Sequence, residues 1–324
     1  MTDNTWPTVD TELIDDVTLY SAKLIIPVTG PVIIDGAVAI HGDRVVHVGK
    51  RRWVLKALKQ EMTAHGTIHE RHWDGVLTPG LINAHTHLQY SGMVQVGQGT
   101  YDRFRAWELA FNEVYAEAQK TQPWKQWAED GARQMVESGT TAAADIVTDL
   151  DAAGALASQG MHGIAYWEVM GWHNAEWMEK GRTELIRQLR RMNEEQLPNL
   201  GISPHAPYTL ESEPFVDLPD IARQLNMRLH IHLAETPLEA GTYPPVLTTY
   251  SAADWSDHDW ESYRQLKEVG KGASAIQFVD QLGSLGPDVH IAHGVWANGE
   301  DRRILRQRGV GVALCPRSNR ITNT

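Results

Sequence analysis

The stretch TPGLINAHTHL, residues 78–88, ends a short apolar segment with two histidines two positions apart. Side chains alternate between the faces of a β-strand, so His85 and His87 point to the same side and both imidazoles can reach one metal ion. Such a pair is a weak signal by itself. Here it follows Pro79 and Gly80 and closes a predicted first strand, which favours a metal-binding role.

Downstream of this stretch, short apolar segments alternate with longer amphipathic ones. This alternation predicts parallel βαβ units, and their repetition predicts a (β/α)8 TIM-type barrel with its active site at the carboxyl ends of the strands. Strands are expected at residues 81–84, 140–147, 162–169, 200–203, 228–233, 288–293 and 309–314. Helices are expected at residues 103–118, 122–137, 174–194, 213–225, 259–269 and 299–308.

The predicted barrel lacks its eighth βα unit, because the sequence ends soon after the seventh strand. Such a barrel would have two unpaired edges, which is unfavourable for a sheet. Upstream, residues 16–50 alternate apolar and polar positions and predict short strands, and residues 51–62 predict a helix. We therefore expect an N-terminal β domain, residues 1–78, that forms a small β-sandwich portion, followed by an incomplete hydrolase barrel, residues 79–324.

Charge and composition narrow the classes of partner. The formal net charge is -12, and an acidic surface repels phosphate backbones and anionic lipid, so we expect no nucleic acid and no membrane as partners. No apolar run approaches the roughly 20 residues of a membrane-spanning helix, and the N-terminus lacks the pattern of a signal peptide. The single cysteine, Cys315, fits a reducing compartment. These features predict a cytoplasmic protein that acts on a small-molecule substrate, with a homodimer as the commonest assembly.

The segment RLHIHLAET, residues 228–236, places a second group of polar side chains at a strand end. His232 lies nearer to the carboxyl end than His230, so His232 is the better metal ligand and His230 is expected to be a hydrogen-bonded core histidine. Glu235 follows in the loop. A carboxylate beside a metal ion can move protons between water and substrate, which makes Glu235 the candidate general acid–base.

Two other strand ends carry candidate residues. His293 closes the sixth strand and is expected to hydrogen-bond the attacking water or the substrate. His205, in GISPHAPYTL, lies between two prolines in the loop after the fourth strand and is a candidate substrate contact. No lysine ends this strand, so one metal ion is favoured over a carbamate-bridged pair. Most of the twelve tryptophans are expected to provide packing, but some of them, Trp107 among them, are candidates to line a pocket for a flat substrate.

Four motifs, PGLINAHTH, HLAE, AHG and CPRSN, together resemble the mononuclear deaminase and chlorohydrolase branch of the amidohydrolase superfamily. The resemblance covers about residues 16–324 and implies an N-terminal β unit that forms a composite sandwich with C-terminal strands. It implies one divalent metal, zinc or alternatively iron. By residue, it implies metal ligands at His85, His87 and His232, a proton-shuttling Glu235, a water-positioning His293 and a substrate-contacting His205.

The same resemblance implies a hydrolytic deaminase that removes an exocyclic amine from a purine-nucleoside-like ring and releases ammonia. The stretches HTHLQYSGMVQVG, GIAYWEVMGW and ALCPRSNR are also similar to the deaminases of aminodeoxyfutalosine, an intermediate of menaquinone biosynthesis. Ring dechlorination and cyclic amide hydrolysis are the alternative reactions on this scaffold.

One departure from the family pattern concerns the fourth protein ligand, an aspartate at the end of the eighth strand. No residue after Cys315 supplies it. Three interpretations stay open at this point: the chain is a fragment, another polypeptide completes it, or it is an inactive remnant.

Overall fold

The computed structural model describes residues 13–194, 197, 199–241, 266 and 269–324. It divides into two compact units, Met1–Gly80 and Leu81–Thr324. Across the described ranges, no helix has both the length and the apolar character needed to cross a bilayer. The helix predicted at residues 259–269 falls largely outside the described residues.

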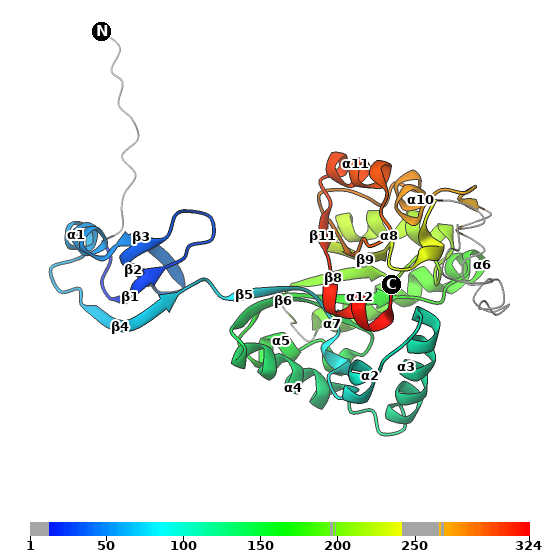
Figure 1. Cartoon of the computed structure of the whole chain (residues 1–324), viewed down its shortest axis with the longest axis horizontal. Helices are drawn as coiled ribbons and strands as arrows, with labels where there is room; N and C mark the ends of the chain where they lie inside the picture. Colours follow the sequence, from blue (N-terminus) through cyan, green and yellow to red (C-terminus); the bar gives the residue numbers. More distant parts are fainter. Residues whose placement is uncertain (1–12, 195–196, 198, 242–265, 267–268) are drawn as a thin grey trace, which may run out of the picture. The chain divides into compact units, whose positions relative to one another are not determined.

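The N-terminal unit is one four-stranded sheet with a helix (Figure 1). β1 (Val17–Ile25), β2 (Ile33–His41) and β3 (Arg44–Lys50) pair antiparallel, α1 (Arg51–Glu61) follows, and β4 (Ile68–Leu77) pairs parallel to β1. This confirms the predicted strands and helix of the segment. β4 was not predicted, because most of its side chains are exposed and it carries little apolar alternation. The second layer implied for a sandwich has no counterpart among the described residues of this unit.

The second unit contains a parallel sheet of seven strands in the order of the sequence. The strands are β5 (Leu81–Thr86), β6 (Thr140–Val147), β7 (His162–Val169), β8 (Leu200–Pro204), β9 (Arg228–Leu233), β10 (Val289–His293) and β11 (Gly311–Ala313). Each predicted barrel strand is confirmed to within two residues at either end. The parallel barrel architecture is therefore confirmed for the seven strands.

Helices follow the strands of this unit along the chain (Figure 1). They are α2 (Val94–Gln98), α3 (Phe104–Ala118), α4 (Trp124–Glu137), α5 (Ala155–Ser158), α6 (Asn174–Glu176), α7 (Arg182–Glu194), α8 (Ser212–Gln224), α10 (Ala275–Gln281), α11 (Gly299–Arg308) and α12 (Pro316–Thr322). The single helix predicted at 174–194 is interrupted by a π-helical turn, Trp177–Gly181. The four unpredicted helices, α2, α5, α10 and α12, span seven residues or fewer, too short for a clear amphipathic period.

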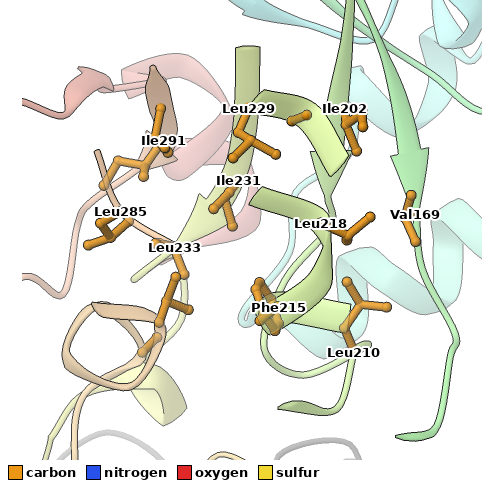
Figure 2. Packing of buried hydrophobic residues seen from close by; sticks show 14 of the residues in the cluster. Val169, Ile202, Leu210, Phe215, Leu218, Leu229, Ile231, Leu233, Leu285 and Ile291 are labelled. Carbon is orange, nitrogen blue, oxygen red and sulfur yellow. The ribbon is translucent and has the colours of Figure 1, made fainter. Parts of the chain in front are cut away.

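Strand β9 shows how the core positions the site. Its apolar residues Leu229, Ile231 and Leu233 are fully buried and pack with Phe215 and Leu218 of α8 in one cluster (Figure 2). Burial of each such side chain contributes about 1.5–3 kcal/mol. Because neighbouring residues of a strand point to opposite faces, the same packing directs His230 and His232 to the other face of the sheet.

The sheet curves so that its first strand, β5, approaches its sixth, β10. His85, at the end of β5, lies with its ring centroid 5.7 Å from that of His293 on β10, although four strands separate β5 from β10 in the sheet order. Near the C-terminus, the Asn323 side chain donates a hydrogen bond to the Asp102 carbonyl just before α3, at 2.5 Å. The carboxyl ends of distant strands therefore share one site.

Candidate metal centre and active site

Three histidines converge at the carboxyl ends of β5 and β9. Ligand nitrogens of His85, His87 and His232 lie within 4.8 Å of one another, and the two Nε2 atoms of His87 and His232 are 3.2 Å apart. Two nitrogens bound to one tetrahedral zinc ion at 2.0–2.1 Å would be about 3.3 Å apart. The spacing in the structure therefore fits a shared ion, and the three predicted ligands are brought together.

Hydrogen bonds at the far ring nitrogens orient two of these imidazoles. His232 Nδ1 lies 3.2 Å from the carbonyl oxygen of His205, so Nδ1 carries the proton and Nε2 keeps its lone pair. His85 Nδ1 lies 2.8 Å from Nε2 of His230, which can accept its proton. Partners of this kind fix the tautomer and direct the ligand. His230 is fully buried and hydrogen-bonded, as predicted.

Burial keeps these histidines in their neutral form. Loss of solvation, with a smaller repulsion from neighbouring imidazoles, holds the pKa values of His85 and His232 well below the ordinary 6.5. The same causes lower the pKa of His87 to about 4 and that of His205 to about 3. Neutral imidazole is the form that binds metal, so the cluster is ready to bind an ion at neutral pH.

Glu235 and His293 form a second pair next to the cluster. Glu235 Oε1 lies 3.4 Å from Nε2 of His293, and Tyr208 donates a hydrogen bond to Glu235 Oε2 at 3.3 Å. Glu235 is only 5% exposed, and burial raises the pKa of its carboxyl. His293 Nδ1 lies 2.8 Å from Oδ1 of Asn319 in α12. A buried carboxyl beside an oriented imidazole can exchange protons with a substrate.

Two buried carboxylates hold the loops that carry these residues. Asp145 on β6 accepts a hydrogen bond from the Leu88 backbone amide at 2.9 Å, next to His87. Glu239 accepts hydrogen bonds from the amides of residues 234–236, each at 2.9 Å, and so fixes Glu235. Sequence reasoning missed both, because a lone carboxylate in a strand or a loop carries no local signal of its partner.

Three residues in this region have left-handed backbone conformations. Their φ angles are 54° at Ala234, 76° at His293 and 49° at Cys315. This region is unfavourable for residues other than glycine, and such strain gathers at functional sites. Each of the three lies just beyond or at the end of β9, β10 or β11, where the chain turns away from the sheet.

His205, predicted as a substrate contact, lies beside the cluster. Its Nδ1 is 2.8 Å from the Thr209 hydroxyl, and its Nε2 is 4.0 Å from Oε1 of Glu168. Glu168 lies on β7 and was not predicted. It is 7% exposed, and burial raises the pKa of its carboxyl to about 8.

An aromatic cavity of about 410 Å³ adjoins the cluster. Its lining includes Tyr90, Phe111, Tyr115, Trp167, Glu168 and Trp172. The Tyr90 ring stacks on His87 with centroids 5.7 Å apart, which places one wall of the cavity against a predicted metal ligand. The volume is in the range of small-molecule sites.

Trp107 does not belong to this lining. Its ring packs between Phe104 and Phe111 of α3, with centroids 5.3 and 5.5 Å away. Phe104 in turn lies 6.3 Å from Tyr208, the hydrogen-bond donor to Glu235. Contact of Trp107 with substrate stays a prediction, as do the chemical roles of the other site residues.

Comparisons with known proteins agree on one family. The model of the Amidohydrolase family matches residues 76–243. The 5-methylthioadenosine/S-adenosylhomocysteine deaminase of Thermococcus kodakarensis is 30% identical over 250 residues, which are 75% of this chain and 52% of that protein. The enzyme of the same name from Moorella thermoacetica is 28% identical over 307 residues, 91% of this chain and 62% of that protein. The chain thus spans about half to three-fifths of these relatives.

Solved structures share the fold. A zinc-bound adenosine deaminase from Xanthomonas campestris aligns over 96% of this chain and 65% of its own, with a TM-score of 0.67 and 20% identity. The aminofutalosine deaminase of Helicobacter pylori, in complex with methylthio-coformycin, aligns over 94% and 71% with a TM-score of 0.71 and 18% identity. At such identities the likeness concerns the fold alone.

Proposed function

The chain belongs to the amidohydrolase family, and from that premise we propose that it acts as a metal-dependent hydrolytic deaminase on a purine-nucleoside-like substrate. The observation that carries the proposal is the convergence of His85, His87 and His232 with the buried Glu235–His293 pair beside them. The names of the relatives, deaminases of adenosine derivatives, support an amine on an adenine-like ring as the reacting group.

The neutral imidazoles of His85, His87 and His232 would hold one divalent metal, and we propose zinc, with iron as the alternative that the same donors allow. A metal bound there would lower the pKa of a water to about 7 and so supply a nucleophile at neutral pH. His230 and the His205 carbonyl keep the proton of their partner imidazoles on the far nitrogen, which leaves the metal-facing lone pairs free.

Glu235 would move the protons of the reaction. Its carboxylate takes a proton from the attacking water and delivers it to a ring nitrogen while the water oxygen bonds to the amine-bearing carbon. The remaining proton of the added hydroxyl then passes by way of Glu235 to the amine, which leaves as ammonia, and the oxygen stays on the ring as a carbonyl. Burial raises the pKa of Glu235, and a carboxyl with a raised pKa can hold the proton between the two steps.

His293 would orient the attacking oxygen. The Asn319 amide donates its own N–H to the Leu314 carbonyl at 2.7 Å, so its oxygen faces His293 and accepts the Nδ1 proton. His293 Nε2 then keeps a lone pair that accepts a hydrogen bond from the water. The same nitrogen lies 3.4 Å from Glu235 and can steady the carboxyl as it receives its proton.

Within this class we propose adenosine derivatives as substrates, and aminodeoxyfutalosine as the first candidate among them. The similarity of GIAYWEVMGW and ALCPRSNR to deaminases of that compound supports this choice. We further propose a homodimer without nucleic-acid or membrane partners, and light scattering of the purified protein would test the assembly.

The test is ammonia release by the full-length, zinc-loaded protein from adenosine, 5-methylthioadenosine and aminodeoxyfutalosine. Glu235→Gln should lower turnover by about 100-fold or more while bound zinc stays at the wild-type level, because the change removes the proton carrier and no metal ligand. Glu137→Gln, an exposed glutamate on α4, is the matched control and should retain full activity. Wild-type turnover in Glu235→Gln, or release of chloride from a triazine in place of ammonia from adenosines, would reject the proposal.

A further inference from the structure

Glu168 carries a buried carboxyl oxygen that the described residues leave unpaired. Its side chain is 3% exposed, and Oε1 makes no hydrogen bond with any residue that the structure describes. His205 Nε2 and His232 Nδ1 each lie 4.0 Å from Oε1, beyond hydrogen-bonding distance. Buried polar groups in proteins are nearly always satisfied, and an exception calls for a ligand or another functional explanation. The mechanism proposed above makes no use of this residue.

Glu168 lies between the histidine cluster and the aromatic cavity. On one side its carboxyl approaches His205 and His232. On the other side Glu168 lines the aromatic cavity together with Tyr90, which stacks on His87. A molecule whose reacting ring lies at the histidine cluster would therefore pass Glu168 where the rest of the molecule enters the cavity.

The residues that line the cavity indicate which kind of ligand it would bind. Tyr115, Trp167 and Trp172 supply flat apolar surfaces. None of the described lining residues is lysine, arginine or histidine, so nothing in the lining would neutralise an anionic group. A carboxyl group keeps an acceptor oxygen whether or not it is protonated, and hydroxyl groups are natural neutral donors to it.

We propose that Glu168 and the aromatic cavity form a specificity subsite for the non-reacting arm of the substrate, in which Glu168 accepts a hydrogen bond from a hydroxyl group of that arm. The inference rests on the proposed function for the identity of the reacting ring. It adds that one residue, Glu168, makes the protein bind nucleosides with hydroxyl groups more tightly than analogues without them.

The test measures binding in place of turnover. Titration calorimetry on the zinc-loaded Glu235→Gln protein gives dissociation constants for adenosine and for 2′,3′-dideoxyadenosine, which lacks the two ring hydroxyls. Adenosine should bind about 10- to 100-fold more tightly, as expected for a hydrogen bond to a charged or buried acceptor. Adding Glu168→Leu should abolish the difference, and adding Glu168→Gln, which keeps an acceptor oxygen, should restore part of it. Glu179→Gln, at an exposed position of the π-helical turn, is the control and should preserve the full ratio.

The outcomes separate this inference from the proposed function. A ratio that survives Glu168→Leu would overturn the subsite even if the wild-type protein deaminates adenosine. A ratio that depends on Glu168 in a protein without deaminase activity would support the subsite and reject the proposed function. Metal analysis supplies a second check: two zinc ions in the wild-type protein and one in Glu168→Leu would make Glu168 a metal ligand and reject its role toward the substrate.

Discussion

Replacement of His230 by leucine tests whether the metal centre depends on a hydrogen bond behind its ligand. His85 Nδ1 lies 2.8 Å from His230 Nε2, and His230 is fully buried, so no water would replace the lost acceptor. Loss of a partner behind a metal-binding histidine typically weakens metal binding 10- to 100-fold. For His230→Leu we therefore expect the dissociation constant of zinc to rise by that factor, or about 1.4–2.7 kcal/mol.

Competition with a chromophoric chelator would measure the zinc affinity of each variant. His230→Gln can place an amide oxygen near the same position and should recover part of the loss, whereas His162→Gln, at an exposed position of β7, should leave the affinity unchanged. The reasoning would be refuted by a His230→Leu protein that is folded, as shown by circular dichroism, and binds zinc within twofold of the wild type.

Three further predictions concern stability and the acid–base pair. The pKa of His87 is lowered from 6.5 to about 4, so below pH 6.5 the unfolded chain binds a proton that the folded metal-free chain does not. The free energy of unfolding should therefore fall between pH 6.5 and pH 4, by up to about 3 kcal/mol for this residue. Urea unfolding that gives the same free energy across that range would contradict this prediction. Glu168→Leu should raise the free energy of unfolding of the metal-free protein by about 1–3 kcal/mol, because it removes a buried unpaired acid. A lower melting temperature in this variant would show that the carboxyl has a partner. Asn319→Ala should reduce kcat about tenfold with little change in KM, because it frees the His293 ring; an unchanged kcat would show that the ring is held by other contacts.

The strands could be predicted where one pattern served both packing and chemistry. In β9 the apolar residues Leu229, Ile231 and Leu233 alternate with two histidines. The sequence therefore indicated both the two-residue period of a strand and the face on which the histidines lie. β4 could not be predicted in this way, because its backbone pairs with β1 while its side chains remain mostly exposed. Its pairing depends on long-range backbone contacts that leave no hydrophobic period.

The residues of the candidate site also fall into those that the sequence predicted and those that it did not. The metal-binding histidines stand in motifs at strand ends, so their convergence followed from the barrel. Glu168 was missed because the role of a single acidic residue in an apolar strand depends on the cavity that its side chain lines. Asn319 stands in CPRSN, but its contact with His293 exists only because α12 follows β11 directly and lies beside β10.

The left-handed conformations at Ala234, His293 and Cys315 bear on how the protein could evolve or be engineered for heat resistance. A non-glycine residue in this region costs roughly 1–2 kcal/mol, which glycine would relieve at the expense of a more disordered unfolded chain. At positions 234 and 315 that exchange is nearly balanced and leaves the catalytic groups in place. At position 293 the same exchange would delete the imidazole. A laboratory selection for thermostability alone would therefore do little to preserve His293, so libraries intended to keep activity should hold that codon fixed.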